Sequence, residues 1–302
     1  MIIKFTAVED GKTVYTAARR ELKVSSSLLR RLKAADAIKV NGEKAFTNRV
    51  LAAGDVLTLD ISAAETTGGV VPEQGELEII WETCDYLAVN KPCGLIVHPT
   101  HSRYKGTLAN FVAGYLPDGV CHVVNRLDRD TSGVVLFAKS AYHKDIASQA
   151  LSETGEKEYT ALVMGCPSPA CGTVNVPIKR LSPDSMLRAA LPDGQAALTR
   201  YETLCTSGDV SLLRIYLETG RTHQIRVHML HIGCPLLGDA LYRTDDSDHA
   251  SESHGITAQA LHARRLSFIP PFCGERVDIS APLRRDDIKK ALIMLKMTCS
   301  DY

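Results

Sequence analysis

Long uncharged apolar runs are missing from this sequence. No stretch of its 302 residues reaches the roughly 20 apolar residues that a membrane-spanning helix needs. Residues 1–10 also lack the apolar core of a secretory signal peptide. We therefore expect no membrane segment and a cytoplasmic location.

Closely spaced cysteine pairs are missing too. Nine cysteines, an odd number, are scattered without a single Cys-x-x-Cys pair, which argues against a disulfide framework and against a zinc–thiolate site. A His-Glu-x-x-His motif is also absent. If residues 223–228 form a strand, His223 and His228 point to opposite faces and cannot share a metal ion. We expect neither a metal nor another cofactor.

An excess of charge of one sign is absent over the whole chain, because 35 Lys and Arg residues balance 35 Asp and Glu residues. The distribution is uneven, however. Between Lys12 and Arg49 ten basic residues face three acidic ones, a local net charge of +7 (10 − 3). A solvated charged face would explain this excess, and so would a surface that contacts phosphates.

The same basic segment has the pattern of a small module over residues 1–61. Helices are predicted over residues 13–22 and from residue 25 or 26 onward, and strands over residues 38–40 and 55–61. Asn41-Gly42 suits the tight turn of a hairpin. The second helix would carry three basic side chains outward: Arg30, Arg31 and Lys33.

The remainder of the chain divides into a tether and a larger domain. Residues 62–75 have little periodicity and several helix and strand breakers, so we expect a flexible linker that lets the two parts move independently. Residues 76–302 would form the larger domain. Residues 245–255 are polar and rich in breakers, which predicts an exposed insertion.

Short strands dominate the larger domain. A helix is expected at residues 144–151, and no regular alternation of strands and helices appears. We therefore predict an α+β fold with a mixed, largely antiparallel sheet rather than a doubly wound one. The predicted strands cover residues 77–81, 87–89, 134–138, 159–164, 212–217 and 225–228.

Two charged segments stand out between apolar runs. Residues 125–133 hold two arginines, two aspartates, two hydroxyls and a glycine, and residues 219–228 gather basic side chains. A carboxylate beside a core is costly unless a cation pairs with it, so Asp–Arg pairing is expected. A purely structural salt-bridged turn would explain the first segment taken alone.

Together these segments resemble the RluA family of pseudouridine synthases. The first matches the family signature His-Arg-Leu-Asp-x-x-Thr-Ser-Gly, except that Asn125 stands in place of the histidine, and the second matches Gly-Arg-x-His-Gln-Ile-Arg-x-His. Three shorter motifs, at residues 90–99, 157–161 and 261–268, follow in family order. The resemblance covers about residues 76–285 and implies a bent sheet with the active site in a central cleft. Residues 12–61 resemble the small alpha-L RNA-binding domain, named after a ribosomal protein.

The resemblance implies a role for each candidate residue. Asp128 matches the essential aspartate, which attacks the nucleoside or removes a sugar proton to give a glycal intermediate. Tyr159 matches an active-site tyrosine that lies against the uracil, and Arg221 is the expected partner that keeps Asp128 charged. Arg126 would fill the space left by a flipped-out nucleotide. Arg226 is grouped with the RNA-contacting residues.

The expected function is therefore isomerisation of specific uridines in structured RNA to pseudouridine, with ribosomal RNA favoured over transfer RNA and no obligate protein partner. A noncatalytic RNA-binding protein that retains the fold is the alternative, although such a protein would not need Asp128, Tyr159 and Arg221 together. A glycosidase is a third reading, because Asp130 lies near Asp128. Two carboxylates so close in sequence do not flank a glycosidic bond well, and Asp130 is better explained as a charge partner for an arginine.

Overall fold

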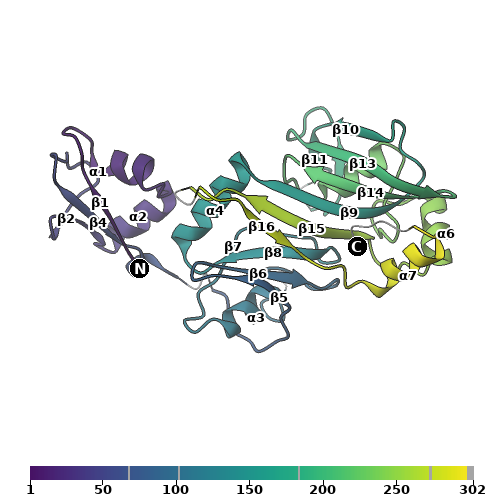
Figure 1. Ribbon diagram of the computed structural model, residues 1–302, viewed down its shortest axis with the longest axis horizontal. Helices are drawn as coiled ribbons and strands as arrows, with labels where there is room; N and C mark the ends of the chain where they lie inside the picture. Colours follow the sequence, from purple (N-terminus) through teal and green to yellow (C-terminus); the bar gives the residue numbers. More distant parts are fainter. Residues whose placement is uncertain (67–68, 101–102, 183, 272–273, 298–302) are drawn as a thin grey trace.

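A ten-stranded mixed sheet forms the framework of the larger domain (Figure 1). The computed structural model describes residues 1–66, 69–100, 103–182, 184–271 and 274–297. Along the sheet the strands follow the order β10-β13-β14-β9-β15-β8-β6-β5, with β16 beside β15 and β7 beside β8. All its strand pairs are antiparallel except β15 with β8. The prediction of a mixed, largely antiparallel α+β fold is confirmed.

The strands of this sheet are β5 (Ile79–Glu82), β6 (Tyr86–Lys91), β7 (His122–Val123), β8 (Ser132–Ala138), β9 (Glu156–Met164), β10 (Cys171–Asn175), β13 (Leu198–Ser207), β14 (Val210–Leu217), β15 (Leu261–Phe268) and β16 (Val277–Ser280). A separate hairpin consists of β11 (Ile178–Arg180) and β12 (Arg188–Ala190). The helices are α3 (Leu108–Tyr115), α4 (Ala141–Glu153), α5 (Gln224–His231), α6 (Asp245–Ser253) and α7 (Asp286–Met294).

Strand β8 lies in the middle of the sheet and follows the first charged segment. All seven of its residues are buried, as expected for an apolar run covered on both faces. Gly133 has φ +114°, and a Cβ there would lie 2.1 Å from the Ala263 carbonyl oxygen on β15. Only glycine therefore lets β8 approach β15 at the end of the loop that carries Asp128.

One prediction of local structure was wrong, and another segment has more regular structure than expected. Residues 225–228 lie in helix α5 rather than in a strand. Because residues 224–229 are all buried, this helix has no exposed face, so its sequence lacks helical periodicity. Residues 245–255, predicted as an exposed insertion, are mostly exposed and contain helix α6. Thr244 and Ser247 form a capping box at its start, and three aspartates in its first turn stabilise the amino terminus.

Residues 1–64 form a smaller unit at one end of the molecule (Figure 1). Its sheet follows the order β1-β4-β2-β3, and its predicted hairpin turn has positive φ at both Asn41 and Gly42. The side chains of Thr13 and Ser25 cap the two predicted helical segments. The elements are β1 (Ile2–Thr6), α1 (Val14–Thr16), a π-helical turn η1 (Ala17–Glu21), α2 (Ser26–Ala34), β2 (Ile38–Val40), β3 (Glu43–Lys44), β4 (Val56–Asp60) and a 3-10 turn η2 (Ile61–Ala64).

The smaller unit shares a hydrophobic core with α4 of the larger domain. Ala141, Tyr142 and Ile146 are buried in the same cluster as the leucines of α2, and the Tyr142 hydroxyl donates to the Leu22 carbonyl at 2.9 Å. This contact differs from the independent movement expected from the sequence. The sequence did not predict this contact, because Tyr142 and Ile146 could equally have packed against the sheet of the larger domain.

Several residues of the predicted linker contact the larger domain as well. Within residues 62–75, positions 67 and 68 lie outside the described residues. Glu65 contacts His122 at 2.9 Å and accepts from the Ala141 main-chain N–H at 2.8 Å. Val70 is buried, and Glu73 accepts from Gly106 N–H at 2.6 Å. The described part of this segment is therefore bound to the larger domain rather than free.

Candidate active site

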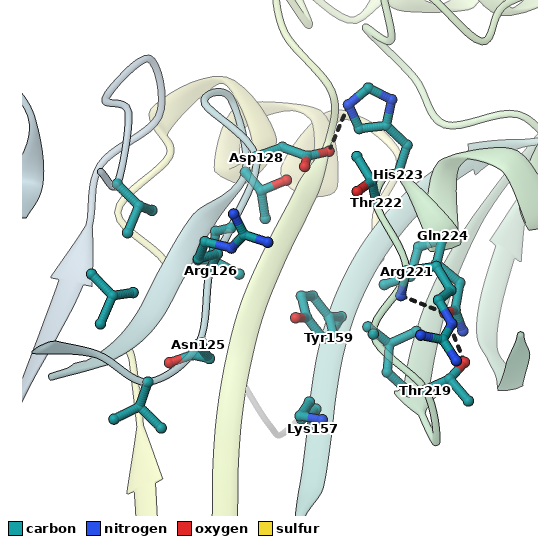
Figure 2. Close-up of a pocket in the computed structure, with 18 of the residues that line it drawn as sticks. Asn125, Arg126, Asp128, Lys157, Tyr159, Thr219, Arg221, Thr222, His223 and Gln224 are labelled. Carbon is teal, nitrogen blue, oxygen red and sulfur yellow. Dashed lines mark hydrogen bonds and ion pairs between the residues drawn. The ribbon is translucent and has the colours of Figure 1, made fainter. Parts of the chain in front are cut away.

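A cleft of about 760 Å³ opens where the two charged segments meet. One wall consists of residues 123–128, before β8, and the opposite wall of residues 217–226, between β14 and α5. Tyr159 on β9, labelled in Figure 2, and the carboxyl-terminal half of α4 also line it. The cleft predicted from the resemblance is present, and it brings together segments that are about ninety residues apart in sequence.

The buried side chain of Lys91 holds the loop that carries Asp128. The Lys91 ammonium is fully buried and donates to three carbonyls: Pro92 at 2.8 Å, Leu95 at 2.9 Å and Arg129 at 2.7 Å. Burial lowers the pKa of Lys91 to about 8, against the opposing effect of nearby acidic groups. A buried ammonium thus fixes the backbone next to Asp128.

Asn125 stands where the resemblance expects histidine, and its role is structural. Its side-chain amide donates to the Val134 carbonyl at 3.1 Å and accepts from Leu136 N–H at 2.8 Å. Through these two bonds the Asn125 side chain extends the contact with β8 beyond the end of β7. The amide therefore anchors the start of the Asp128 loop to the central strand.

The Asp128 carboxylate is paired with Arg226. Arg226 Nη1 donates to Asp128 Oδ2 at 3.1 Å, and its other guanidinium nitrogens donate to Asp239 at 2.6 and 2.7 Å. Arg226 and Asp239 are buried, whereas the Asp128 side chain is 28% exposed and faces the cleft. Burial opposes the charge of Arg226, but Asp239 and Asp128 outweigh it and raise the pKa of the guanidinium.

The prediction that Arg221 is the partner of Asp128 was wrong. Arg221 lines the same cleft, but its Nε donates to the Ala196 carbonyl at 3.0 Å, and Figure 2 shows its side chain directed away from Asp128. Arg226, which we had grouped with RNA contacts, takes its place. Arg221 lies in the loop before α5, whereas Arg226 lies within the helix, and treating this segment as a strand hid which of them faces inward.

The loop before α5 is fixed by Gln224. The Gln224 carbonyl oxygen accepts from the Thr219 hydroxyl at 2.8 Å and from Arg221 N–H at 2.9 Å, as drawn in Figure 2. Its amide nitrogen donates to Leu198 and Thr199 on β13. A buried amide thus satisfies the polar groups of the turn that forms one wall of the cleft.

Tyr159 and Arg126 face each other across the cleft. Tyr159 is 8% exposed, and burial, with the Asp128 carboxylate as a further cause, raises the pKa of its hydroxyl well above the ordinary value. It is therefore a neutral phenol in the resting site. Arg126 is exposed and points from the Asp128 loop toward the cleft in Figure 2.

His223 lies close to Asp128 but belongs to no metal cluster. Its Nε2 is 3.9 Å from Asp128 Oδ2, and its Nδ1 is 2.9 Å from the Tyr242 hydroxyl. His228 instead contacts Thr199 and the Val176 carbonyl. Among the described residues no group of three or more potential ligands could hold a metal ion.

The three basic residues predicted on the second helix lie on α2, outside the cleft. Arg30 and Lys33 are exposed. Arg31 is only half-buried, and its Nε is buried. Its charge is close enough to Glu65 to help lower the pKa of that carboxyl, an effect that burial opposes and the His122 hydrogen bond promotes.

Two further residues of the site escaped sequence reasoning. Lys91 lies in a motif that we recognised, yet its position before Pro92 gives no sign that it supports the loop of Asp128. Asp239 follows an apolar run and a glycine, and no spacing links it to Arg226 thirteen residues earlier.

None of the helices within the described residues combines the length and the apolar character that a membrane span requires.

Comparisons with known proteins agree with this geometry. The family model for RNA pseudouridylate synthase matches residues 85–231. The chain is 36% identical to the Bacillus subtilis protein named "Uncharacterized RNA pseudouridine synthase YhcT", over 92% of each chain. It is 39% identical to ribosomal large subunit pseudouridine synthase D of Zymomonas mobilis, over 77% of each. This chain belongs to the RNA pseudouridine synthase family.

Solved structures support the fold. The structure of human RNA pseudouridylate synthase domain containing 4 superimposes with a TM-score of 0.58 and 24% identity, over 72% of this chain and 92% of that one. The human domain containing 1 superimposes with a TM-score of 0.57, also at 24% identity, over 75% and 98%. The large mixed sheet of this chain thus matches the fold of solved pseudouridylate synthases.

Proposed function

We propose that the cleft isomerises uridine in RNA to pseudouridine, with Asp128 as the reacting carboxylate. The observation that carries this proposal is the pairing of Asp128, on the cleft wall, with a buried guanidinium that is itself held by Asp239. A cation so placed favours the charged carboxylate, which the reaction requires in either of its two possible routes.

The reaction needs no cofactor. The bond from uracil N1 to the sugar C1′ breaks, the base turns, and C5 bonds to C1′, after which C5 loses its proton and N1 carries one. Neither oxidant nor external energy source is consumed, so the product RNA has an unchanged mass. Asp128 attacks the nucleoside or removes a sugar proton to give a glycal, and both routes use the same carboxylate.

Tyr159 and Arg126 serve the base rather than the sugar in this proposal. The neutral Tyr159 phenol, on the floor of the cleft, lies against the uracil face and assists proton transfer at the new bond. Arg126 projects from the Asp128 loop and fills the gap left when the nucleotide is extruded from a helix. Arg221 lines the opposite wall and is proposed to contact the RNA.

The Asp128→Asn variant tests the assignment. Transcribed ribosomal and transfer RNA would be incubated with each protein and pseudouridine mapped by chemical blocking of reverse transcription. We expect signal with the natural protein and with Asp130→Asn, the matched control, because Asp130 is in the same loop but pairs with Arg129. Asp128→Asn should give none. Undiminished turnover by Asp128→Asn would refute its role, whereas free uracil as product would indicate a glycosidase, and binding without product a noncatalytic protein.

We further propose that the substrate is ribosomal RNA, which places the enzyme in the cytoplasm. Relatives from Zymomonas mobilis and Xanthomonas campestris are both named ribosomal large subunit pseudouridine synthase D. Profiling pseudouridine in total RNA from cells with and without the gene would identify the target. Loss of signal confined to transfer RNA would overturn the ribosomal assignment.

The smaller unit is proposed to dock on RNA as an alpha-L type domain, with residues 62–75 joining it to the catalytic domain at residues 76–302. Its basic helix α2 exposes Arg30 and Lys33. Replacing both by Ala should weaken RNA binding and reduce the salt slope by about two, one for each lost phosphate contact. Lys289→Ala with Lys290→Ala removes the same charge from exposed positions of α7, at the other end of the molecule (Figure 1). Equal salt slopes for both double variants would contradict the proposal.

A further inference from the structure

His223 occupies an unusual backbone position beside the reacting carboxylate. It has φ +58° and precedes the first residue of α5. A side-chain-bearing residue in this left-handed conformation is costly, and such strain is retained where the surroundings require it. The turn directs the imidazole toward Asp128, as Figure 2 shows.

The hydrogen bonds of Tyr242 determine which nitrogen of His223 carries the proton. The main-chain N–H of Arg188, on β12, donates to the Tyr242 oxygen at 2.9 Å. Tyr242 is buried, and with its oxygen already accepting from Arg188 its own hydroxyl hydrogen is best satisfied by His223 Nδ1, which lies 2.9 Å away. With Nδ1 as the acceptor, a neutral ring carries its proton on Nε2, the nitrogen that faces Asp128.

Taken together, burial and the charged groups around the ring lower the pKa of His223 and so favour its neutral form. Burial lowers the pKa of His223, and the Asp128 carboxylate opposes that effect. Arg226 and Arg188 lower the pKa further, while Asp239 raises it. Arg226 also lies over the Tyr242 ring at 4.9 Å, so the tyrosine, the arginine and the histidine hold one another in place.

Both donors on this side approach the same oxygen of Asp128. Arg226 Nη1 is 3.1 Å from Oδ2, and His223 Nε2 is 3.9 Å from the same atom. The second distance exceeds a hydrogen bond by somewhat less than an ångström. Two donors on Oδ2 would leave Oδ1 as the oxygen available to a nucleoside.

We propose that His223 is a positioning residue for the reaction, held by Tyr242 in the Nε2–H form so that it and Arg226 together grip Asp128 Oδ2 and present Oδ1 to the substrate. This inference rests on the proposed function of Asp128. Since Tyr242 also accepts from the backbone of β12, the β11–β12 hairpin is tied to the same network.

The first test needs no RNA. Long-range nitrogen–proton NMR spectra of protein labelled in histidine would show which ring nitrogen of His223 is protonated. We expect the Nε2–H form in the natural protein and its loss in Tyr242→Phe, which keeps the ring beneath Arg226 but removes the hydroxyl. An Nδ1–H form in the natural protein would overturn the proposal whether or not the chain isomerises uridine.

The second test follows single-turnover pseudouridine formation and RNA binding as a function of pH. His223→Leu should lower the rate constant by at least about tenfold, the effect of losing one hydrogen bond to a charged group, without changing RNA affinity. Its acid limb should move to higher pH, because the carboxylate has lost a donor. His223→Gln retains an N–H donor and should remain within about threefold of the natural protein.

Tyr201→Phe is the matched control for Tyr242→Phe, because it removes a tyrosine hydroxyl that donates to the Pro169 carbonyl, outside the cleft. It should leave the rate and its pH profile unchanged. A His223→Leu protein with the natural rate at every pH, or with weaker RNA binding and an unchanged rate constant, would refute a positioning role. Inactivity of the natural protein, by contrast, would count against the proposed function and leave the NMR result to decide the tautomer.

Discussion

At the scale of single residues, the site depends on one buried cation that serves two carboxylates. Arg226 joins Asp239, whose side chain is 0% exposed, to Asp128 in the cleft. Removing one partner of a buried ion pair leaves an uncompensated charge, which costs far more than breaking an exposed pair. The Arg226 guanidinium therefore stabilises the fold through Asp239 and also pairs with the carboxylate of Asp128.

The first prediction concerns Arg226→Met. We expect this variant to lose about 3 to 5 kcal/mol in the free energy of unfolding, measured in urea, and to form no detectable pseudouridine. Arg243→Met breaks the exposed pair of Arg243 with Asp248 and should cost less than about 1 kcal/mol while retaining activity. Equal losses for the two variants would show that Asp239 finds another partner.

At the scale of elements, the parallel pair of β8 with β15 holds the Asp128 loop in place. The two strands pair over only two positions, His262 with Ser132 and Ala263 with Gly133. A side-chain contact reinforces this short ladder, since Ser132 Oγ is 2.9 Å from His262 Nδ1. The other ring nitrogen donates to the Ala281 carbonyl at 3.0 Å. In the neutral ring that burial favours, Nδ1 therefore accepts from the serine.

Acid should weaken this junction. Burial lowers the pKa of His262 to about 4, from 6.5 in an unfolded chain, so the unfolded state binds more protons between these values. The stability that His262 contributes is full above pH 6.5 and falls as the pH drops toward 4, by about 3 kcal/mol at the limit. Urea unfolding from pH 7.5 to pH 4.5 should show a steeper loss for the natural protein than for His262→Asn. Parallel curves would contradict this prediction.

At the scale of the whole molecule, α4 connects the smaller unit to the catalytic cleft. Tyr142 and Ile146, near its amino terminus, lie in the core of the smaller unit, while Ser148, Leu151 and Ser152 line the cleft. The helix advances 1.5 Å per residue, so about 15 Å along its axis separate Tyr142 from Ser152. The basic surface of α2 is thereby held at a set distance from Asp128.

Truncation should reveal this shared core. Deleting residues 1–61 should weaken RNA binding and also destabilise the remaining domain, because it exposes the apolar side of α4. In the full chain Ile146→Ser should cost about 2 to 4 kcal/mol, whereas in the truncated protein it should cost little, since Ile146 is already in water. Thermal and urea unfolding of the four proteins would measure the difference, and the same cost in both backgrounds would show that the units do not share a core.

The amino-acid sequence determined most of what local pattern encodes. The buried strands, the starts of two helical segments near residues 13 and 25, and the Asn41-Gly42 turn depend on neighbouring residues, and the structure confirms them. The family motifs likewise identified both walls of the cleft, because a reaction requires particular side chains at particular spacings.

Tertiary structure alone decided which charges meet. Arg226 rather than Arg221 faces Asp128 because residues 224–231 form a buried helix, whose apolar spacing in sequence resembles a strand. Asp239 and Lys91 join the site from distant segments, and the buried contacts of Tyr142 bind two units that the sequence shows as separate. Ion pairs and shared cores are formed between side chains that are far apart in sequence, and no local pattern specifies which of several partners will be nearest after folding.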